Sequence, residues 1–169
     1  MQLKKIDKAL YRQRVRTISI VSVLALLLIS FASSTTLIQL FSEPNSGNFY
    51  YNLAGVVFAC LVVGLALKKL KYRSPYFAEA AYIWDLKHEL NLIQRKLKTI
   101  QAAAAKNDQA ALTILNFSYA GSRLIWQLDD NTLMMSELNQ ADNALQQQIE
   151  ALGIRISADD YQRELLQRF

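Results

Sequence analysis

The sequence has few of the residues on which most catalytic and metal sites depend. Among its 169 residues there is one cysteine, Cys60, and one histidine, His88, with only five glycines and two prolines. A single thiol excludes an intrachain disulfide and a CxxC site, and a single histidine leaves zinc without its usual ligands. The sequence also contains no GxxxxGK[ST] phosphate loop, GxGxxG fingerprint or GxSxG elbow. We therefore expect no cofactor, no metal site and no enzymatic activity.

Two local patterns resemble catalytic motifs but are better explained by structure. His88 and Glu89 begin like the HExxH motif of zinc proteases, but Leu92 occupies the position of the second ligand. Adjacent aspartates at 129–130 and 159–160 fall at the ends of expected helices. Neighbouring side chains on a helix point in different directions, so we interpret both pairs as helix-capping residues.

The net charge of +5 is unevenly distributed. Residues 1–16 hold six basic side chains and one acid, whereas residues 74–169 hold nine basic and twelve acidic ones. The second region has no basic stripe of the kind that binds nucleic acid, so we predict no nucleic-acid partner. Basic residues beside an apolar span can instead contact anionic lipid headgroups. The residues expected to make these contacts are Lys4, Lys5, Lys8, Arg12, Lys68, Lys69, Lys71 and Arg73.

Two long stretches without charge occupy residues 17–42 and 44–67. The hydrocarbon core of a bilayer is about 30 Å thick and is crossed by roughly 20 apolar helical residues. Neither stretch has the polar face of a soluble helix. We predict a transmembrane helical hairpin over residues 17–67, with spans at about 17–41 and 48–67 and a polar turn at 42–47. A signal peptide is the alternative for the first stretch, but its apolar run is long and a second span follows at once.

The charges beside the spans predict the orientation of the hairpin. Basic residues precede the first span and follow the second, while the turn carries only the acid Glu43. The positive-inside rule then places both termini in the cytoplasm and the turn outside. This predicts a multi-pass protein of the bacterial inner membrane.

Small and hydroxyl-bearing residues suggest two uses for the spans. Gly55 and Ala59 are four residues apart, as are Cys60 and Gly64, and this spacing lets helices approach closely. The candidate packing residues are Gly55, Ala59 and Gly64; we favour packing of the hairpin on itself, with pairing between chains as the alternative. The hydroxyl run at residues 33–36 raises a second possibility, an oligomeric channel or transporter subunit. Neither span contains an Asp, Glu, Lys, Arg or His residue, which weighs against an ion pathway.

The basic segments on either side of the hairpin have separate roles. In residues 1–16, Leu3, Ile6 and Leu10 recur at helical spacing opposite lysines, as in a helix that lies on an anionic membrane surface. A frayed tail that carries only orienting charges is an equal alternative. Residues 68–74 form a basic exit linker, and Ser74 followed by proline indicates the start of a helix.

Residues 75–169 are predicted to form a cytoplasmic bundle of three to four helices. From Ile83 to Ala104 the apolar residues alternate at spacings of three and four, which is a heptad seam within a helix of about 75–106. A middle helix runs to about 129, and a third spans about 132–152 before Gly153. Ser157 is expected to cap a short fourth helix. The seam, which packs either inside the bundle or against a partner, comprises Ile83, Leu86, Leu90, Ile93, Leu97 and Ile100.

The order of these parts is itself informative. A basic N-terminus, two spans with a short turn, the exit sequence KKLKYR and an Ala- and Leu-rich helical tail follow one another. This layout resembles small, uncharacterised bacterial inner-membrane proteins from a family of unknown function. Such a family has no assigned activity, so the resemblance implies no role for any residue. We predict a membrane-anchored helical interaction or scaffold protein, whose partner is another protein or a second copy of the chain.

Overall fold

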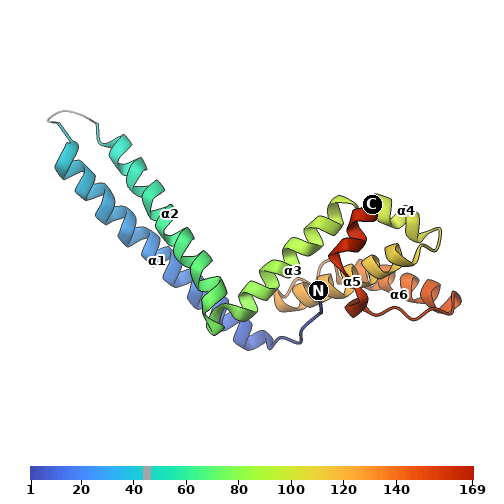
Figure 1. The fold of residues 1–169 in the computed structure, drawn as a ribbon. Coiled ribbons are helices and arrows are strands. Elements are labelled where there is room, and N and C mark those ends of the chain that lie inside the picture. Colours follow the sequence, from blue (N-terminus) through green and yellow to red (C-terminus); the bar gives the residue numbers. More distant parts are fainter. Residues whose placement is uncertain (44–46) are drawn as a thin grey trace. The chain divides into compact units, whose positions relative to one another are not determined.

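The computed structural model describes residues 1–43 and 47–169, and every regular element in those residues is helical. This confirms the all-α class; the middle of the predicted turn, residues 44–46, lies outside the described residues. The elements, shown in Figure 1, are α1 (Lys8–Phe41), α2 (Phe49–Arg73), η1 (Pro75–Phe77), α3 (Ala78–Arg95), α4 (Leu97–Ala104), α5 (Gln109–Leu128), α6 (Met135–Ala151), η2 (Ala158–Asp160) and η3 (Arg163–Arg168), where η marks a 3₁₀ helix.

The chain forms two compact units. One consists of Ala9–Ala81 and is called the hairpin unit here. The other, the helical domain, joins Met1–Lys8 to Tyr82–Phe169. The predicted boundaries after residues 16 and 74 therefore do not coincide with those of the compact units. Both long helices continue past their apolar runs into charged sequence, because lysine and arginine are good helix formers and no breaker occurs before Ser74 and Pro75.

In the hairpin unit, α1 and α2 are each long enough and apolar enough to cross a membrane. Their outer faces expose large apolar side chains, such as Leu28, Phe31 and Leu65. At the end of α2, Ser74 adopts an extended conformation and its hydroxyl accepts a hydrogen bond from the backbone of Tyr76. Pro75 is the first residue of η1, as the sequence predicts.

In the helical domain, α5 is the central element and packs against α4, α6, η2 and η3. Residues 110–117 of α5 are buried without interruption, which agrees with the prediction of a middle helix. Helix α3 approaches α5 closely at Gly121. A Cβ atom at that position would lie 3.3 Å from side-chain carbons of both Leu86 and Leu90. A small residue in α5 thus lets the seam of α3 reach the core.

Three helices of the domain end in the same way. Asn107, Asp130 and Gly153 have positive φ angles of 63°, 54° and 66° and follow α4, α5 and α6. Beyond each of them the next amide bonds to a carbonyl five residues earlier, which is the Schellman arrangement. Asp108 then caps α5 by accepting a hydrogen bond from the amide of Ala111. The breaks predicted near residues 107, 130 and 153 lie at these positions.

Two helices in the structure differ from those predicted from the sequence. The helix predicted over 75–106 begins as η1 and is interrupted at Lys96, where φ is −110° and ψ is 7°. The Lys96 amide bonds to Ile93, three residues back, and its ammonium group donates to the carbonyl of Leu166. The break thus coincides with a tertiary contact to the C-terminal segment. The short fourth helix after Ser157 consists of the 3₁₀ helices η2 and η3 and is not α-helical.

Candidate functional site

The two long helices of the hairpin meet at a face of small residues. Ala59 is 1% exposed and Ser34 is buried, and an added Cβ at Gly55 would overlap the Ser34 hydroxyl. Ser33 Oγ donates to the carbonyl of Gly55 at 3.2 Å, and Ser34 Oγ donates to that of Asn52 at 3.4 Å. Close approach and hydroxyl–carbonyl contacts are a typical means of packing apolar helices.

Gly64 does not take part in this contact. Nothing lies within 4 Å of a Cβ built on it, and Cys60 is also exposed. The buried face of α2 runs through Gly55, Ala59 and Val63 instead. These residues repeat every four positions, whereas Gly64 lies one residue further and therefore about 100° around the helix. Gly64 was thus incorrectly grouped with residues that pack the hairpin on itself.

The hydroxyl run of α1 is satisfied within the hairpin. Ser33 and Thr36 donate to carbonyls four residues earlier, at 2.6 Å and 2.8 Å, and Thr35 does the same at 2.9 Å. An open groove passes along these helices, and most of its lining is apolar: Ile29, Ala32, Ser33, Thr36, Leu37, Ala54 and Phe58. Hydroxyls that bond to their own backbone do not need water or a solute as a partner.

The seam of α3 and α4 is directed into the helical domain. Ile83, Leu86, Ile93 and Ile100 are each at most 2% exposed within a single chain. Leu90 and Leu97 are half-buried. Because the apolar seam is covered by the chain itself, a partner that binds the domain would have to use another surface.

Truncation of a seam residue is expected to destabilise the helical domain. Leu90→Ala removes a half-buried side chain that contacts the Gly121 region, so the cost should be about 2 kcal/mol, the low end for leucine-to-alanine changes. Chemical denaturation of the full chain in detergent, followed by Trp126 fluorescence in a Trp84→Phe background, would measure it. A midpoint unchanged by Leu90→Ala, together with weaker self-association, would indicate that the seam is an interface between chains.

A buried acid and a tyrosine join α3 to the C-terminal segment. Glu89 is 7% exposed and Tyr161 is 1% exposed, and the Tyr161 hydroxyl donates to Glu89 Oε1 at 2.7 Å. The Tyr161 ring stacks on Phe117 with centroids 4.1 Å apart. Arg163 Nε lies 3.8 Å from the second oxygen of Glu89. This pair was not predicted from the sequence, although Glu89 lies three residues after Leu86 and four before Ile93, on the buried face of α3.

The environment of Tyr161 makes it a stable hydrogen-bond donor. Burial raises the pKa of its hydroxyl, and both the hydrogen bond and the charge of Glu89 raise it further, while Arg163 lowers it. A tyrosine with a raised pKa is a poor proton donor near neutral pH. Within residues 1–43 and 47–169, no three His, Cys, Asp or Glu side chains are grouped to hold a metal ion. We interpret the Glu89–Tyr161 hydrogen bond as a structural contact that fixes the C-terminal segment to α3.

A second polar contact holds α5, α6 and the C-terminal segment together. Asn116 is buried, and its amide nitrogen donates to the carbonyl of Ile156 at 3.3 Å. Its oxygen accepts from Gln146 Nε2 at 3.0 Å. Nearby, Arg123 pairs with Asp142 at 2.7 Å. Each of these side chains therefore has at least one polar partner, as expected of polar groups in a stable core.

Residues 1–8, called the N-terminal strap here, pack on the helical domain. The amide of Lys4 donates to the Tyr82 hydroxyl at 2.9 Å, and that hydroxyl donates to the carbonyl of Gln2 at 3.1 Å. The amide of Leu3 donates to Asp159 at 3.4 Å. Neither alternative for this segment, a surface helix or a frayed tail, describes residues 1–7, because backbone groups of residues 2–4 bond to the domain and helix α1 begins only at Lys8.

Some of the basic residues predicted to contact lipid have a partner in the structure, and others have exposed side chains. Lys4 lies over the Tyr82 ring at 5.5 Å, and Lys8 forms an ion pair with Asp130, so both have partners in the domain. The ammonium of Lys71 lies 5.4 Å from the Tyr72 ring. The side chains of the other five are exposed, and Arg12 among them also has a partner: Lys5, Arg12, Lys68, Lys69 and Arg73.

Tyr82→Phe is expected to loosen the strap without unfolding the domain. The change removes a hydroxyl that takes part in both hydrogen bonds to residues 2 and 4, at a cost of about 1–2 kcal/mol for two partly exposed bonds. Limited trypsin digestion of the purified chain should then cleave after Lys4 and Lys5 faster than in the unmodified protein. Equal cleavage rates would show that these bonds do not hold the strap, and Tyr50→Phe is a matched control.

These features define a class: an all-helical protein with two helices able to cross a membrane and a separate helical domain. The chain belongs to the protein family of unknown function DUF3087, whose model matches residues 1–166. This confirms the resemblance to an uncharacterised family. No curated protein and no solved structure matches the chain.

Proposed function

We propose that this protein is a two-span inner-membrane protein that holds its helical domain in the cytoplasm as an interaction scaffold. The observation that carries the proposal is the outer surface of the hairpin. Phe31 is 73% exposed, and Leu28 and Leu65 are similarly uncovered. Apolar surface left in water costs about 25 cal/mol per Å², and a bilayer removes that cost.

The N-terminal strap supports the proposed orientation. Residues 1–8 form one compact unit with residues 82–169, although the hairpin lies between them in the sequence. Two membrane crossings return the chain to its starting side, so this packing is compatible with a spanning hairpin and not with a single crossing. The exposed bases beside the spans, Lys68 and Lys69 among them, favour the cytoplasmic side.

Two features support the proposed interaction role: the helical domain has a complete core of its own, and the hairpin would anchor it at a membrane. Its apolar seam is internal, and its polar core contacts fix the C-terminal segment, so the domain needs no second chain to complete its core. A self-contained domain fixed beside a membrane is suited to binding another protein there. We expect the partner to use the charged outer surface and not the seam.

The alternative of an oligomeric channel or transporter subunit has less support. The groove of the hairpin includes Ser33 and Thr36, but their hydroxyls bond to carbonyls of the hairpin. Flux through liposomes that contain the purified chain, compared with a Ser33→Ala and Thr36→Val variant, would test this alternative. Flux above that of empty vesicles that depends on these hydroxyls would favour it over the scaffold.

Two steps test the scaffold proposal. The full chain should stay in the membrane pellet after alkaline carbonate extraction, whereas release into the supernatant would contradict the membrane anchor. Cross-linking in intact membranes should then join the full chain to a protein that a chain ending at residue 81 does not capture. The same cross-linked products from both chains would contradict a scaffold role for the domain.

A further inference from the structure

A surface cavity of about 350 Å³ lies between the end of α3 and the C-terminal segment of the helical domain. Its lining comes from within residues 92–96 on one side and residues 163–167 on the other. Figure 1 shows the C-terminal segment, in red, where α3 meets α4, and a hydrogen bond from Lys96 to Leu166 joins the two sides. Ligand cavities commonly measure about 300–1,000 Å³, so this one is large enough for a small organic molecule or for one side chain of another protein.

Three cationic side chains line the cavity: Arg95, Lys96 and Arg163. The ammonium group of Lys96 donates to the carbonyl of Leu166 at 2.8 Å, which holds it at the wall of the cavity. An ammonium group has three donors, so two of them are left for another acceptor. The two arginines come from different segments, one from the last turn of α3 and one from the start of η3. Tertiary packing therefore brings together cations that are far apart in the sequence.

Both guanidinium groups are oriented through their Nε atoms. Arg95 Nε donates to Asn91 Oδ1 at 3.3 Å, and Arg163 Nε lies 3.8 Å from Glu89 Oε2. Within the residues that the structure describes, the terminal Nη atoms of both arginines have no hydrogen-bond or ion-pair partner. Each guanidinium therefore has its four Nη–H donors left for an acceptor in the cavity. The planar end of a guanidinium matches the two oxygens of a carboxylate.

Acidic groups offset most of this positive charge. Glu164 also lines the cavity, and Glu89 lies beside Arg163. The terminal carboxylate of Phe169 lies outside the lining but belongs to the same segment. These groups and the three cations together carry at most one unit of excess positive charge. A phosphate group, with a charge of about −1.5 to −2 at neutral pH, would need a larger excess. A single carboxylate is better matched, because charge-assisted hydrogen bonds from a guanidinium can hold it.

Two leucines give the cavity an apolar wall beside these donors. Leu92 is half-buried in α3, and Leu166 is buried in η3. Ligand cavities typically combine apolar walls with a few well-placed polar groups that orient the ligand. The combination here suits a ligand that has one charged end and a short carbon chain.

We propose that this cavity binds a single carboxylate carried on a short apolar chain. A small organic acid has this chemistry, and so does an acidic side chain beside a leucine in a protein segment. The carboxylate accepts hydrogen bonds from the Nη groups of Arg95 and Arg163, and the carbon chain packs on Leu92 and Leu166. The inference goes beyond the proposed function and does not require it, because every lining residue lies in the helical domain.

Binding of acids and their neutral isosteres to the full chain in uncharged detergent tests this inference. Butyrate is compared with butyramide, and leucyl-glutamate with leucyl-glutamine, both dipeptides being acetylated and amidated at their ends. Inorganic phosphate is the fifth probe. Saturation-transfer NMR, with dissociation constants measured by titration or competition at constant ionic strength, suits weak binding. We expect each acid to bind about tenfold more tightly than its neutral isostere, the fold-change for one charge-assisted hydrogen bond.

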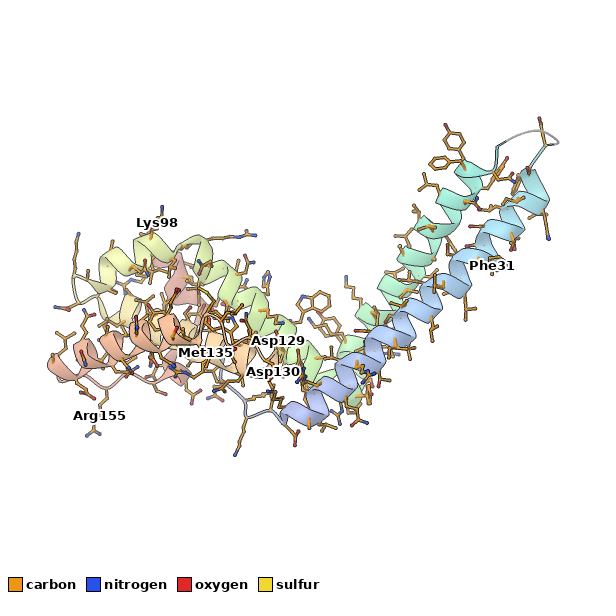
Figure 2. The ribbon with its side chains drawn as sticks, turned by 180° about the vertical axis from the view of Figure 1, so that it is seen from behind. Phe31, Lys98, Asp129, Asp130, Met135 and Arg155 are labelled. Atoms are coloured by element: carbon orange, nitrogen blue, oxygen red, sulfur yellow. The ribbon has the colours of Figure 1, made fainter. Side chains whose placement is uncertain are left out.

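Substitutions of the two arginines locate the binding. Arg95→Gln and Arg163→Gln should each weaken binding of both acids about tenfold, because each removes a guanidinium from the cavity. Arg155→Gln is the matched control: Arg155 does not line the cavity, and Figure 2 shows it pointing away from the domain on the side opposite Lys98. Thermal melts followed by circular dichroism check that the variants fold. If Arg163→Gln does not fold because Glu89 loses its neighbour, Arg95→Gln still provides the test.

The probes also distinguish the two sources of the carboxylate. Tighter binding of the acidic dipeptide than of butyrate would support the inference with a protein segment as the ligand. Equal or weaker binding of the dipeptide would support it with a free organic acid as the ligand. The inference would be overturned if neither acid binds, if acids and amides bind equally, or if both arginine variants bind like the unmodified chain. Tighter binding of phosphate than of either acid would also overturn it.

Discussion

Gly55→Val is expected to separate α1 from α2 and to lower the stability of the hairpin by about 3 kcal/mol, the upper end for overpacking. A Cβ at this position would overlap the Ser34 hydroxyl and lie 2.8 Å from the Ser34 amide nitrogen. Backbone atoms cannot rotate away as a flexible side chain can. The helices must move apart, and the bond from Ser33 to the Gly55 carbonyl should be lost with the close contact.

Gly64→Val provides a matched control. It makes the same chemical change in the same helix, but nothing lies within 4 Å of the added carbon. Thermal unfolding of the full chain in detergent, followed by circular dichroism, should show a lower midpoint for Gly55→Val and little change for Gly64→Val. If Gly64→Val were the more damaging change, the helices would meet on a different face of α2, or α2 would pair with another chain.

Tyr161→Ala is expected to lower the free energy of unfolding of the helical domain by about 5 kcal/mol, the upper end for loss of a buried aromatic ring. The ring is almost fully buried against Phe117, so its removal leaves a cavity. It also leaves the buried carboxylate of Glu89 without its 2.7 Å hydrogen bond. An unsatisfied buried acid adds to the cost of the cavity. Chemical denaturation of the full chain in detergent would measure the change.

Tyr161→Phe separates the two contributions. The stacked ring is kept and only the hydroxyl is lost, so we expect a cost of about 1–3 kcal/mol. An equal loss for the phenylalanine and alanine variants would mean that the ring contributes nothing. No loss for the phenylalanine variant would mean that the bond to Glu89 does not hold the C-terminal segment.

Tyr161 is also expected to make the stability of the helical domain depend on pH in the alkaline range. Burial and Glu89 raise the pKa of Tyr161 in the folded state above its value of about 10 in the unfolded chain. The folded state therefore holds this proton more tightly, so the stability that it contributes is complete below about pH 10 and is lost as pH rises further. Tyr161→Phe should flatten this loss. Tyr82 and Tyr119, whose pKa values burial also raises, should account for part of what remains.

Features determined by local sequence were predictable. Charge-free runs identified both long helices, and the turn chemistry of Asn107 and Gly153 located two helix ends. The spacing of Gly55 and Ala59 identified residues able to pack closely, but spacing alone does not show which face of a helix meets its neighbour. Gly64 was included for that reason, although it lies on the open side of α2.

Features determined by distant residues were not predictable. The break at Lys96 has no glycine or proline and coincides with a bond to Leu166, seventy residues away. Glu89 and Tyr161 are separated by 72 residues. The strap has the apolar spacing of a surface helix, and only its bonds to Tyr82 and Asp159 show that it belongs to the domain. Such contacts leave no periodic signal in a single sequence.

The central claim is that the hairpin crosses the membrane twice and returns both flanks to the cytoplasm. Single cysteines in a Cys60→Ser background test it most directly: Glu43→Cys beside the turn, and Lys98→Cys on the exposed surface of α4. In intact cells, a maleimide that cannot cross the inner membrane should label residue 43 and should reach residue 98 only after lysis. Labelling of residue 98 in intact cells, or of residue 43 only after lysis, would contradict the account.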